Sequence, residues 1–549
     1  MAIPVDNNSS KIPNAILKCS SLKSETLNIS HTLLKTNYLP YIEEMLSKNA
    51  VQNLLMNSCS LDETVFIPIL DLLKKYGSNL CVIEFFDNQI NSSCIIPLAQ
   101  TLPHLPLLER VKIGDNPLTS DNLAHFFSSL VIYCPFIKQI HIGGISLEQD
   151  GAKKICPYLL QLSHLSSLGL RGCSLGPRGI AELYPVLCKP STDYIYLRQN
   201  NLGDEGIAVL AMVLSNNPAL RILEVQSNNI GPKGVQTIMD VLMNLRSSSW
   251  LHAVNFTNNL IGDEGVKYIA GVIRMQSTLY WPGEVTIRPG VKLSVRGIQS
   301  LILSGCGISS EAAADLASLI ESPNSPVTNL DLSSNEIGTS GVTTLMPSLR
   351  KAPLTSLNLT ENKITSGGAL PIALALAANP VLKQLNLSVN MLRNTGALQL
   401  ARSLLTNTNL SRLLLTDNAF TDDAGKYFLD SLKQCHQKSS LAHLAIGGQR
   451  AGVANRIRES IRDPIDQYLR LIGQRRRNSV PVITEYPIMP LTPAPEHRRY
   501  SSLDIPTHHH RRSSSIMGFE PSFCDIPSGT PQLDFDCPMP SPTNLDRYL

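Results

Sequence analysis

Hydrophobic and polar residues recur along most of this chain in one short pattern. In residues 327–341, VTNLDLSSNEIGTSG, Leu330 and Leu332 alternate with polar residues, and Asn335 follows them. An alternation with a period of two places both leucines on the same face of a β-strand. A buried amide at the strand's end can satisfy backbone groups where the chain turns away. The stretch therefore predicts a short strand with one buried face, followed by a turn.

A helical segment is expected after each such strand. In residues 397–404, Ala397, Leu400, Ala401 and Leu404 are spaced i, i+3, i+4 and i+7, which is one face of an α-helix. A single strand and helix cannot cover their own apolar faces, so the units must stack on one another. The pattern thus predicts an α/β solenoid.

Fifteen copies of the pattern can be aligned, and all but one of the steps between them are 27 to 31 residues long. The copies begin at residues 24, 51, 80, 108, 137, 165, 192, 220, 251, 298, 327, 354, 382, 410 and 441. This period, with an LxxLxLxxN core, is that of a leucine-rich repeat. We expect a lead-in over 1–23, a solenoid over 24–473 and a capping helix over its last part, 455–473.

The units of 27 to 29 residues resemble the ribonuclease-inhibitor-like leucine-rich repeats, a class that includes the sensor domains of NOD-like receptors and the Ran GTPase-activating protein. The resemblance covers about residues 24–460. It implies a horseshoe with a parallel sheet on the concave face and helices outside, and members of the class mostly bind other proteins on that face. The chain has no GxxxxGK[ST] phosphate loop, so a complete receptor of the NOD-like type is not expected.

The one long step, 47 residues, predicts an insertion over 278–297. Two runs rich in β-formers flank Pro289 and Gly290, which suit a type II turn, so a short hairpin is expected. The insertion carries Trp281, one of only two tryptophans. We favour a tolerated loop insertion over the alternative, a binding element that presents Trp281 to a partner.

Composition and motifs argue against several classes of function. The net charge is +3 with 17% charged residues, a balance that does not call for nucleic acid or a membrane surface. HExxH, GxSxG and paired CxxC motifs are missing, so no cofactor, metal or enzymatic activity is expected. The chain also lacks a run of about 18 apolar residues and a secretory signal, and its 12 cysteines are scattered. These features favour a cytoplasmic protein without disulfides.

The composition changes after the repeats. Residues 474–549 are rich in Pro, Ser and Arg without apolar periodicity, which predicts a disordered tail. Arginine pairs precede Ser479, Ser501 and Ser514, as in substrates of basophilic kinases. The RxxSxP sequence at Ser479 also resembles a ligand of the 14-3-3 adaptors. An unmodified basic tail is the alternative, and we favour phosphorylation over it.

Polar and aromatic residues between the core leucines are expected to face the concave surface. In the C-terminal half they are small, as at Thr328 and Thr355. In the N-terminal half they are aromatic or basic: Phe86, Arg110, Lys112, His141, Arg171, Tyr194, Tyr196, Arg198 and Arg221. Tyr and Arg dominate binding hot spots in protein interfaces, so this cluster predicts a partner-binding site.

The sequence thus favours a monomeric, non-enzymatic protein-binding scaffold or regulator whose tail is controlled by phosphorylation. One alternative is a GTPase-activating or other catalytic regulator of the Ran GTPase-activating protein type. That protein typically carries an acidic stretch after its repeats, whereas this tail is neutral to basic. A second alternative is an immune-type sensor fragment or a host-directed effector.

Overall fold

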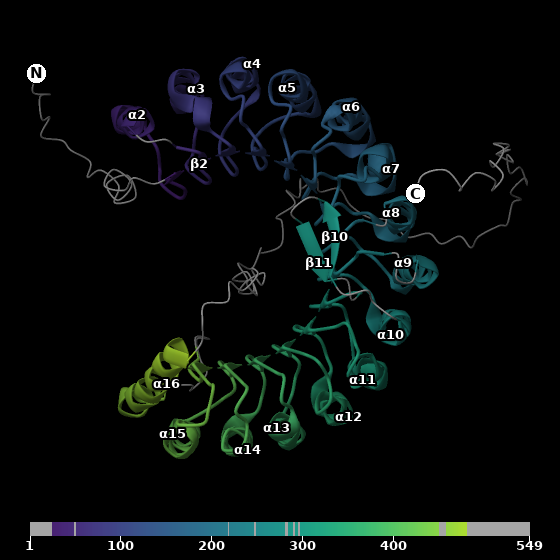
Figure 1. Ribbon diagram of the computed structural model, residues 1–549, viewed down its shortest axis with the longest axis vertical. Helices are drawn as coiled ribbons and strands as arrows, with labels where there is room; N and C mark the ends of the chain where they lie inside the picture. Colours follow the sequence, from purple (N-terminus) through teal and green to yellow (C-terminus); the bar gives the residue numbers. More distant parts are fainter. Residues whose placement is uncertain are drawn as a thin grey trace, which may run out of the picture. The chain divides into compact units, whose positions relative to one another are not determined.

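The structure, a computed structural model, shows the predicted α/β leucine-rich repeat solenoid (Figure 1). It describes residues 25–48, 51–217, 219–245, 249–279, 284–288, 291–294, 297–448 and 457–479. All of them lie within one compact unit that ends at Pro481, and only this unit is described below. Its parallel sheet lines the concave face, and its helices lie outside.

Fifteen short parallel strands form a single open sheet, and their order in the sheet follows the chain. They are β1 (Thr26–Asn28), β2 (Asn53–Leu55), β3 (Val82–Glu84), β4 (Arg110–Lys112), β5 (Gln139–His141), β6 (Ser167–Gly169), β7 (Tyr194–Tyr196), β8 (Ile222–Glu224), β9 (Ala253–Asn255), β12 (Ser300–Ile302), β13 (Asn329–Asp331), β14 (Ser356–Asn358), β15 (Gln384–Asn386), β16 (Arg412–Leu414) and β17 (His443–Ala445). The middle residue of each strand is buried, as Leu330 and Leu357 illustrate, and it pairs with the middle residue of the next strand.

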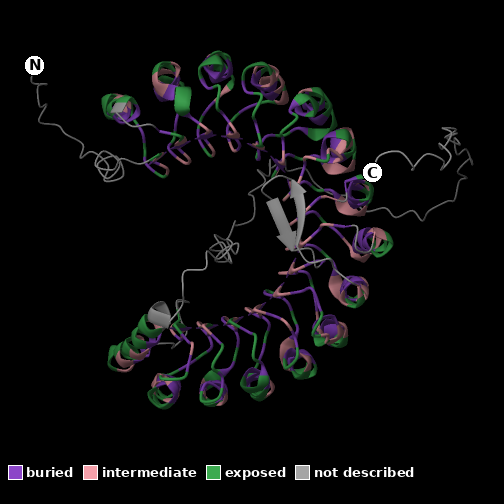
Figure 2. Ribbon diagram, in the orientation of Figure 1, coloured by how far each residue is buried: buried purple, intermediate pink, exposed green. Residues whose placement is uncertain are grey.

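A helix follows each strand of this sheet and packs on its outer side. The helices are α2 (Leu39–Lys48), α3 (Glu63–Tyr76), α4 (Ile95–Thr101), α5 (Ser120–Tyr133), α6 (Glu148–Gln161), α7 (Gly176–Leu187), α8 (Gly203–Asn216), α9 (Pro232–Leu245), α10 (Gly262–Thr278), α11 (Ala313–Glu321), α12 (Gly338–Leu349), α13 (Ala369–Ala378), α14 (Arg393–Ser403), α15 (Asp422–Cys435) and α16 (Glu459–Ser479). Short 3-10 segments lie at Thr36–Tyr38, Gly77–Asn79, Ser92–Cys94, Leu102–His104, Ser310–Ala312 and Ser366–Gly368. The buried apolar residues of the strands and helices form one continuous core, and Figure 2 colours the chain by burial.

Asparagines at the strand exits join consecutive repeats. The Asn335 side-chain amide donates to the carbonyls of Leu303 and Leu332 at 2.8 and 2.9 Å, and its oxygen accepts from the amides of Cys306 and Ile308, each at 3.0 Å. Each buried backbone group that is satisfied in this way avoids a desolvation penalty of about 1–3 kcal/mol. The predicted role of the asparagine is therefore confirmed.

Cysteines take the same place in three repeats. The Cys59 thiol donates to the carbonyl of Ile29 at 3.2 Å, and the Cys306 thiol donates to that of Phe256 at 3.3 Å. Burial raises the pKa of Cys173 and of Cys306 to about 12. These thiols are therefore packing groups rather than nucleophiles.

The insertion interrupts the sequence of the sheet but not the sheet itself. Its strands β10 (Glu284–Arg288) and β11 (Val291–Ser294) pair antiparallel with each other, whereas β9 pairs directly with β12. The Gln276 side chain accepts a hydrogen bond from the Ile298 amide at 3.2 Å, which holds the two ends of the insertion together. Trp281 lies outside the described residues.

Helix α16 covers the last repeat. Ile457, just before it, and Ile465, Leu469 and Ile472 within it are buried. The helix continues six residues past Gly473, where we expected it to end. The Arg475 guanidinium donates to the carbonyl of His436 at 2.9 Å and to that of Ser439, so the extra turns contact the preceding repeat.

Parts of the chain for which we made predictions lie outside the described residues. These are the lead-in over 1–23, residues 449–456 and the tail from residue 480, with Ser501 and Ser514. None of the described helices combines the length and apolar character that crossing a lipid bilayer requires.

Candidate binding site on the concave face

The concave surface is built from rows of side chains that run across neighbouring strands. Side chains alternate along a strand, so the residues on either side of each buried middle residue face the concave side, as Tyr194 and Tyr196 do around Ile195. Parallel strands lie about 4.8 Å apart, which brings equivalent residues of neighbouring repeats into contact. One such row contains Glu84, Lys112, His141, Gly169, Tyr196 and Glu224.

A hollow of about 360 Å³ lies over the N-terminal part of this row. It is lined by His31, Asn57, Ser58, Glu84, Phe86, Lys112, His141, Gly143, Gly169, Arg171 and Tyr196. Five of the ten residues predicted for partner binding line this hollow: Phe86, Lys112, His141, Arg171 and Tyr196. The fold therefore brings predicted residues from five different repeats to one depression.

A glycine forms part of the floor of this hollow. Gly169 lies between His141 and Tyr196 in the row, and the rings of those two residues meet with their centroids 5.5 Å apart. A Cβ atom at Gly169 would lie 2.4 Å from Nδ1 of His141. The two rings can therefore approach each other only because this position has no side chain.

Both rings are held in their neutral forms. Burial, helped by the positive charge of Lys112, lowers the pKa of His141 to about 4. Burial and the nearby Glu224 carboxylate raise the pKa of Tyr196 to about 12. At neutral pH the hollow thus offers an uncharged imidazole and a protonated phenol.

One acidic side chain lies among the basic ones. Glu84 is buried, and its carboxylate accepts from Nζ of Lys112 at 2.9 Å and from the side-chain amide of Asn57 at 3.0 Å. Burial opposes its charge, but these hydrogen bonds and the attraction of Lys112 outweigh that effect and lower the pKa of Glu84. Lys112 therefore already has a buried counter-charge.

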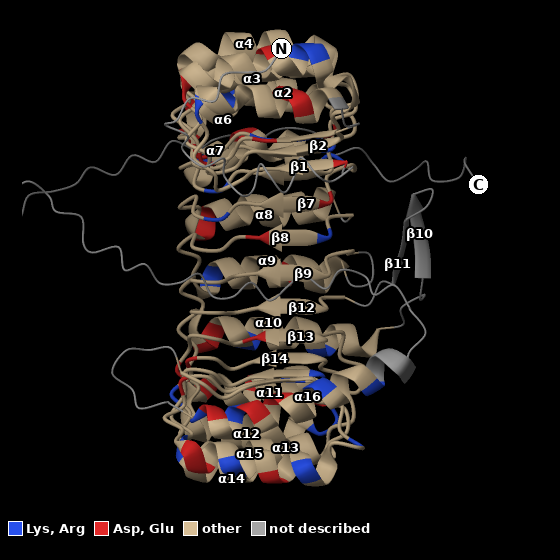
Figure 3. Cartoon of the chain, turned by 90° about the vertical axis from the view of Figure 1, so that its left-hand side faces the viewer, with Lys and Arg blue, Asp and Glu red and all other residues tan. Residues whose placement is uncertain are grey.

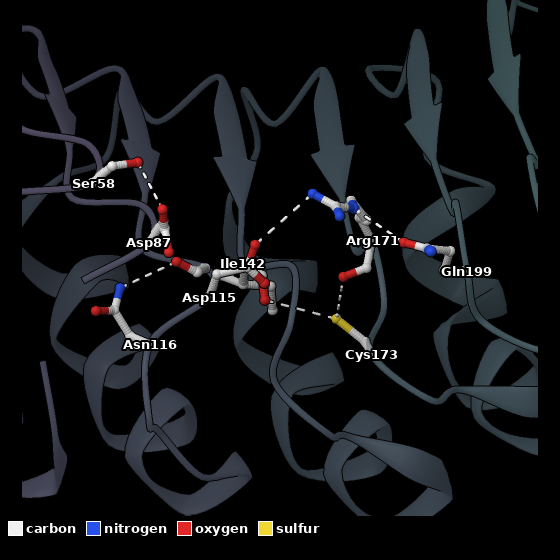
Figure 4. Close-up of polar contacts among 9 residues, drawn as sticks. Ser58, Asp87, Asp115, Asn116, Ile142, Arg171, Cys173 and Gln199 are labelled. Atoms are coloured by element: carbon white, nitrogen blue, oxygen red, sulfur yellow. Dashed lines mark hydrogen bonds and ion pairs between the residues drawn. The ribbon is translucent and has the colours of Figure 1, made fainter. Parts of the chain in front are cut away.

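The arginines differ in how far they are engaged. Nε of Arg171 donates to Oε1 of Gln199 at 3.2 Å, and its Nη1 lies 3.8 Å from Oδ2 of Asp115 (Figure 4). Nε of Arg110 donates to Oε1 of Gln139 at 2.6 Å, a bond across neighbouring strands.

Two further arginines carry a buried nitrogen that has no hydrogen-bond partner among the described residues. The guanidinium of Arg221 stacks on the ring of Tyr194, 5.5 Å from its centroid. Nε of Arg198 and Nε of Arg221 are both buried, and neither makes a hydrogen bond to any described residue. Such unsatisfied donors are costly when they are buried.

Some of the residues in this site were missed by the sequence analysis. Glu84 and Asn57 occupy concave positions like those of the predicted residues. Their positions in the repeat could therefore have identified them from the sequence. Gly169 gave no signal, because its importance depends on the rings beside it.

Among the predicted residues, Ser479 is the last residue of α16. Within the described ranges, no group of three or more His, Cys, Asp or Glu side chains is arranged to hold a metal ion.

The strand, asparagine and outer helix of each unit define this molecule as a leucine-rich repeat solenoid. The profile of a family described as Leucine Rich repeat matches residues 216–239, 247–270, 324–346 and 351–373. Pig (Sus scrofa) ribonuclease inhibitor is 27% identical over 257 residues, which are 46% of this chain and 51% of that protein. Mouse (Mus musculus) NACHT, LRR and PYD domains-containing protein 14 is 28% identical over 208 residues, 37% of this chain and 19% of that protein.

The chain thus contains leucine-rich repeats and is similar to proteins of the ribonuclease-inhibitor-like class. It spans about half the length of the ribonuclease inhibitors that it matches and a smaller part of the NACHT proteins. A crystal structure of an internalin from Listeria monocytogenes aligns with 74% of this chain and 89% of its own, at 18% identity and a TM-score of 0.37.

Proposed function

We propose that this protein is a non-enzymatic protein-binding scaffold or regulator that holds its partner on the concave face of its N-terminal half. The observation that carries the proposal is the cluster of aromatic and arginine side chains that consecutive strands, β3 to β8, present on one surface. Side chains of these types dominate binding hot spots. A rigid sheet also limits the entropy lost when they are ordered on binding.

Among the described residues, the buried arginine nitrogens that lack a hydrogen-bond partner lie in the N-terminal half of the concave face. In the C-terminal half, Asn358 donates to Asp331 at 3.0 Å and Thr355 donates to Asn329 at 3.1 Å. A partner there would have to compete with these bonds. In the N-terminal half, buried nitrogens of Arg198 and Arg221 have no partner among the described residues. Figure 3 shows the charged residues with the sheet facing the viewer.

The test compares two triple variants of the full chain. Tyr194→Ala, Tyr196→Ala and Arg198→Ala remove the candidate hot spot without touching a buried strand residue. The control removes Gln384, Arg412 and His443, which occupy the same row position as Tyr194 on β15, β16 and β17.

Partners captured from cell extract are identified by mass spectrometry for the unmutated chain and both variants. We expect the first variant to lose them, because each hot-spot truncation costs more than about 1 kcal/mol of affinity. The control should retain them. If the control loses the partners while the first variant keeps them, the site lies in the other half of the solenoid. The alternative of a GTPase-activating regulator predicts that the protein accelerates GTP hydrolysis by a small GTPase, and a scaffold would not.

We also propose that the tail is regulated by phosphorylation at Ser479, Ser501 and Ser514, and that phosphorylated Ser479 binds a 14-3-3 adaptor. Ser479 ends α16, and a phosphate at a helix C-terminus is repelled by the negative end of the helix dipole. Modification would therefore weaken the last turn of α16. A cytoplasmic, monomeric protein and a binding role for Trp281 likewise remain predictions.

A further inference from the structure

We propose that the hollow over Gly169 receives a segment of a partner protein in which an acidic side chain lies beside an aromatic one. The carboxylate would pair with Arg198 and Arg171, and the aromatic ring would enter the hollow. This inference rests on the proposed binding role of the concave face and adds the chemistry of the partner.

The positive charge in this region is incompletely compensated. Lys112 has Glu84 as a counter-charge at 2.9 Å, whereas the carboxylate nearest to Arg171 is that of Asp115, at 3.8 Å. Arg198 occupies the position next to Arg171 on the following repeat, and its buried Nε has no hydrogen-bond partner among the described residues. Burial and the charge of Arg171 lower the pKa of Arg198. The two guanidinium groups repel each other, and a carboxylate between them would relieve that repulsion.

The nearest acidic residue on the following strand does not fill this role. Glu224 accepts a hydrogen bond from the Gln226 side chain at 2.9 Å and forms no ion pair with Arg198 in the described part of the chain. Burial raises the pKa of Glu224, and the attraction of Arg198 opposes that rise. Glu224 thus attracts Arg198 without a direct ion pair among the described residues, so an external carboxylate can bind Arg198 directly.

The hollow itself suits a flat apolar group. The rings of Phe86, His141 and Tyr196 line it, and Gly169 leaves its floor free of a side chain. Aromatic side chains stack well against such rings. Each of them buries roughly 150–250 Å² of surface. An aromatic residue next to the carboxylate would thus fill the space beside Arg171.

A carboxylate fits this surface better than a phosphate. Asp115 lies beside Arg171, and Asp87 lies on the same side, where it accepts from Ser58 at 2.7 Å (Figure 4). A group with nearly two negative charges would be repelled by both, whereas a single carboxylate matches one guanidinium. Acidic residues also interrupt the basic ones, so the surface offers no continuous track for nucleic acid.

The test is a selection from a random peptide library displayed on phage, with the full-length protein as bait. We expect the enriched sequences to place Asp or Glu close in sequence to Phe, Tyr or Trp, because Arg171 itself lines the hollow. When the Arg198→Gln variant is the bait, the selected peptides should no longer be enriched in Asp or Glu. Selection on Arg412→Gln, an arginine of the same sheet in the C-terminal half, should keep that enrichment.

Individual peptides then separate the possible outcomes by fluorescence anisotropy. Replacing the acidic residue by its amide should weaken binding at least about tenfold, and Arg198→Gln should abolish that difference. A phosphoserine peptide that binds more tightly than the aspartate peptide would overturn the choice of a carboxylate. Peptides that need Tyr194 and Tyr196 but carry no acidic residue would overturn this inference and leave the proposed function standing. No enrichment, or enrichment that ignores the concave residues, would overturn both.

Discussion

Replacing His141 by glutamine should reduce the dependence of the solenoid's stability on pH. Burial, together with Lys112 and Arg110, disfavours the imidazolium, and the opposing attraction of Glu84 does not outweigh them. The pKa of His141 is therefore about 4 in the folded protein, against 6.5 for an ordinary histidine. As pH falls below 6.5, the unfolded chain binds this proton first. The stability that His141 contributes is thus complete above pH 6.5 and is lost as the pH falls toward 4.

The size of the effect follows from the two pKa values. Their difference, 6.5 minus about 4, corresponds to about 3 kcal/mol over the whole range. Between pH 7 and pH 5 the loss amounts to about 2 kcal/mol. His252, whose pKa is also lowered to about 4 by burial and by Arg221, should lose a similar amount. The unmutated protein should therefore lose about twice as much stability from these two histidines as the His141→Gln variant.

The assay is urea unfolding followed by circular dichroism at pH 7 and pH 5. The matched control is His104→Gln, which makes the same replacement at an exposed histidine. Neutral glutamine cannot take up the proton, so the variant should show the smaller difference between the two pH values. Equal differences for the variant and the unmutated chain would show that the folded protein protonates His141 as readily as the unfolded chain does, which would refute this reasoning.

Two further predictions follow from other parts of the molecule. Asn200→Ala should destabilise the solenoid by about 2–4 kcal/mol, because its amide donates to Leu170 and Leu197 and its oxygen accepts from Cys173. Replacing the exposed Asn409 by Ala should change the unfolding free energy by less than about 0.5 kcal/mol, and equal losses for the two variants would contradict the bonding role of Asn200. A phosphopeptide covering 475–483 should bind a 14-3-3 protein with a micromolar dissociation constant or better, about 8 kcal/mol, and equal binding of the unphosphorylated peptide would exclude the proposal.

The sequence alone determined the repeat architecture, because the signals involved are local. Alternation around residues such as Leu330 specifies which face of a strand is buried, and the place of Asn335 specifies where the chain turns. Fifteen repetitions made the pattern unambiguous. The same alternation indicated that Tyr194 and Tyr196 face the concave side, and the structure places them there.

The candidate site depended on contacts between residues about 28 positions apart in the chain, which only the tertiary structure decides. Arg110 and Arg198 look alike in the sequence, yet Gln139 bonds Nε of Arg110, whereas Nε of Arg198 is buried without a partner in the described part of the chain. Gly169 matters because the rings of His141 and Tyr196 meet there. Burial and charge at a given atom come from the strands on both sides. A local pattern therefore identifies which residues face the hollow, and the packing of neighbouring repeats decides which of them remain free to bind.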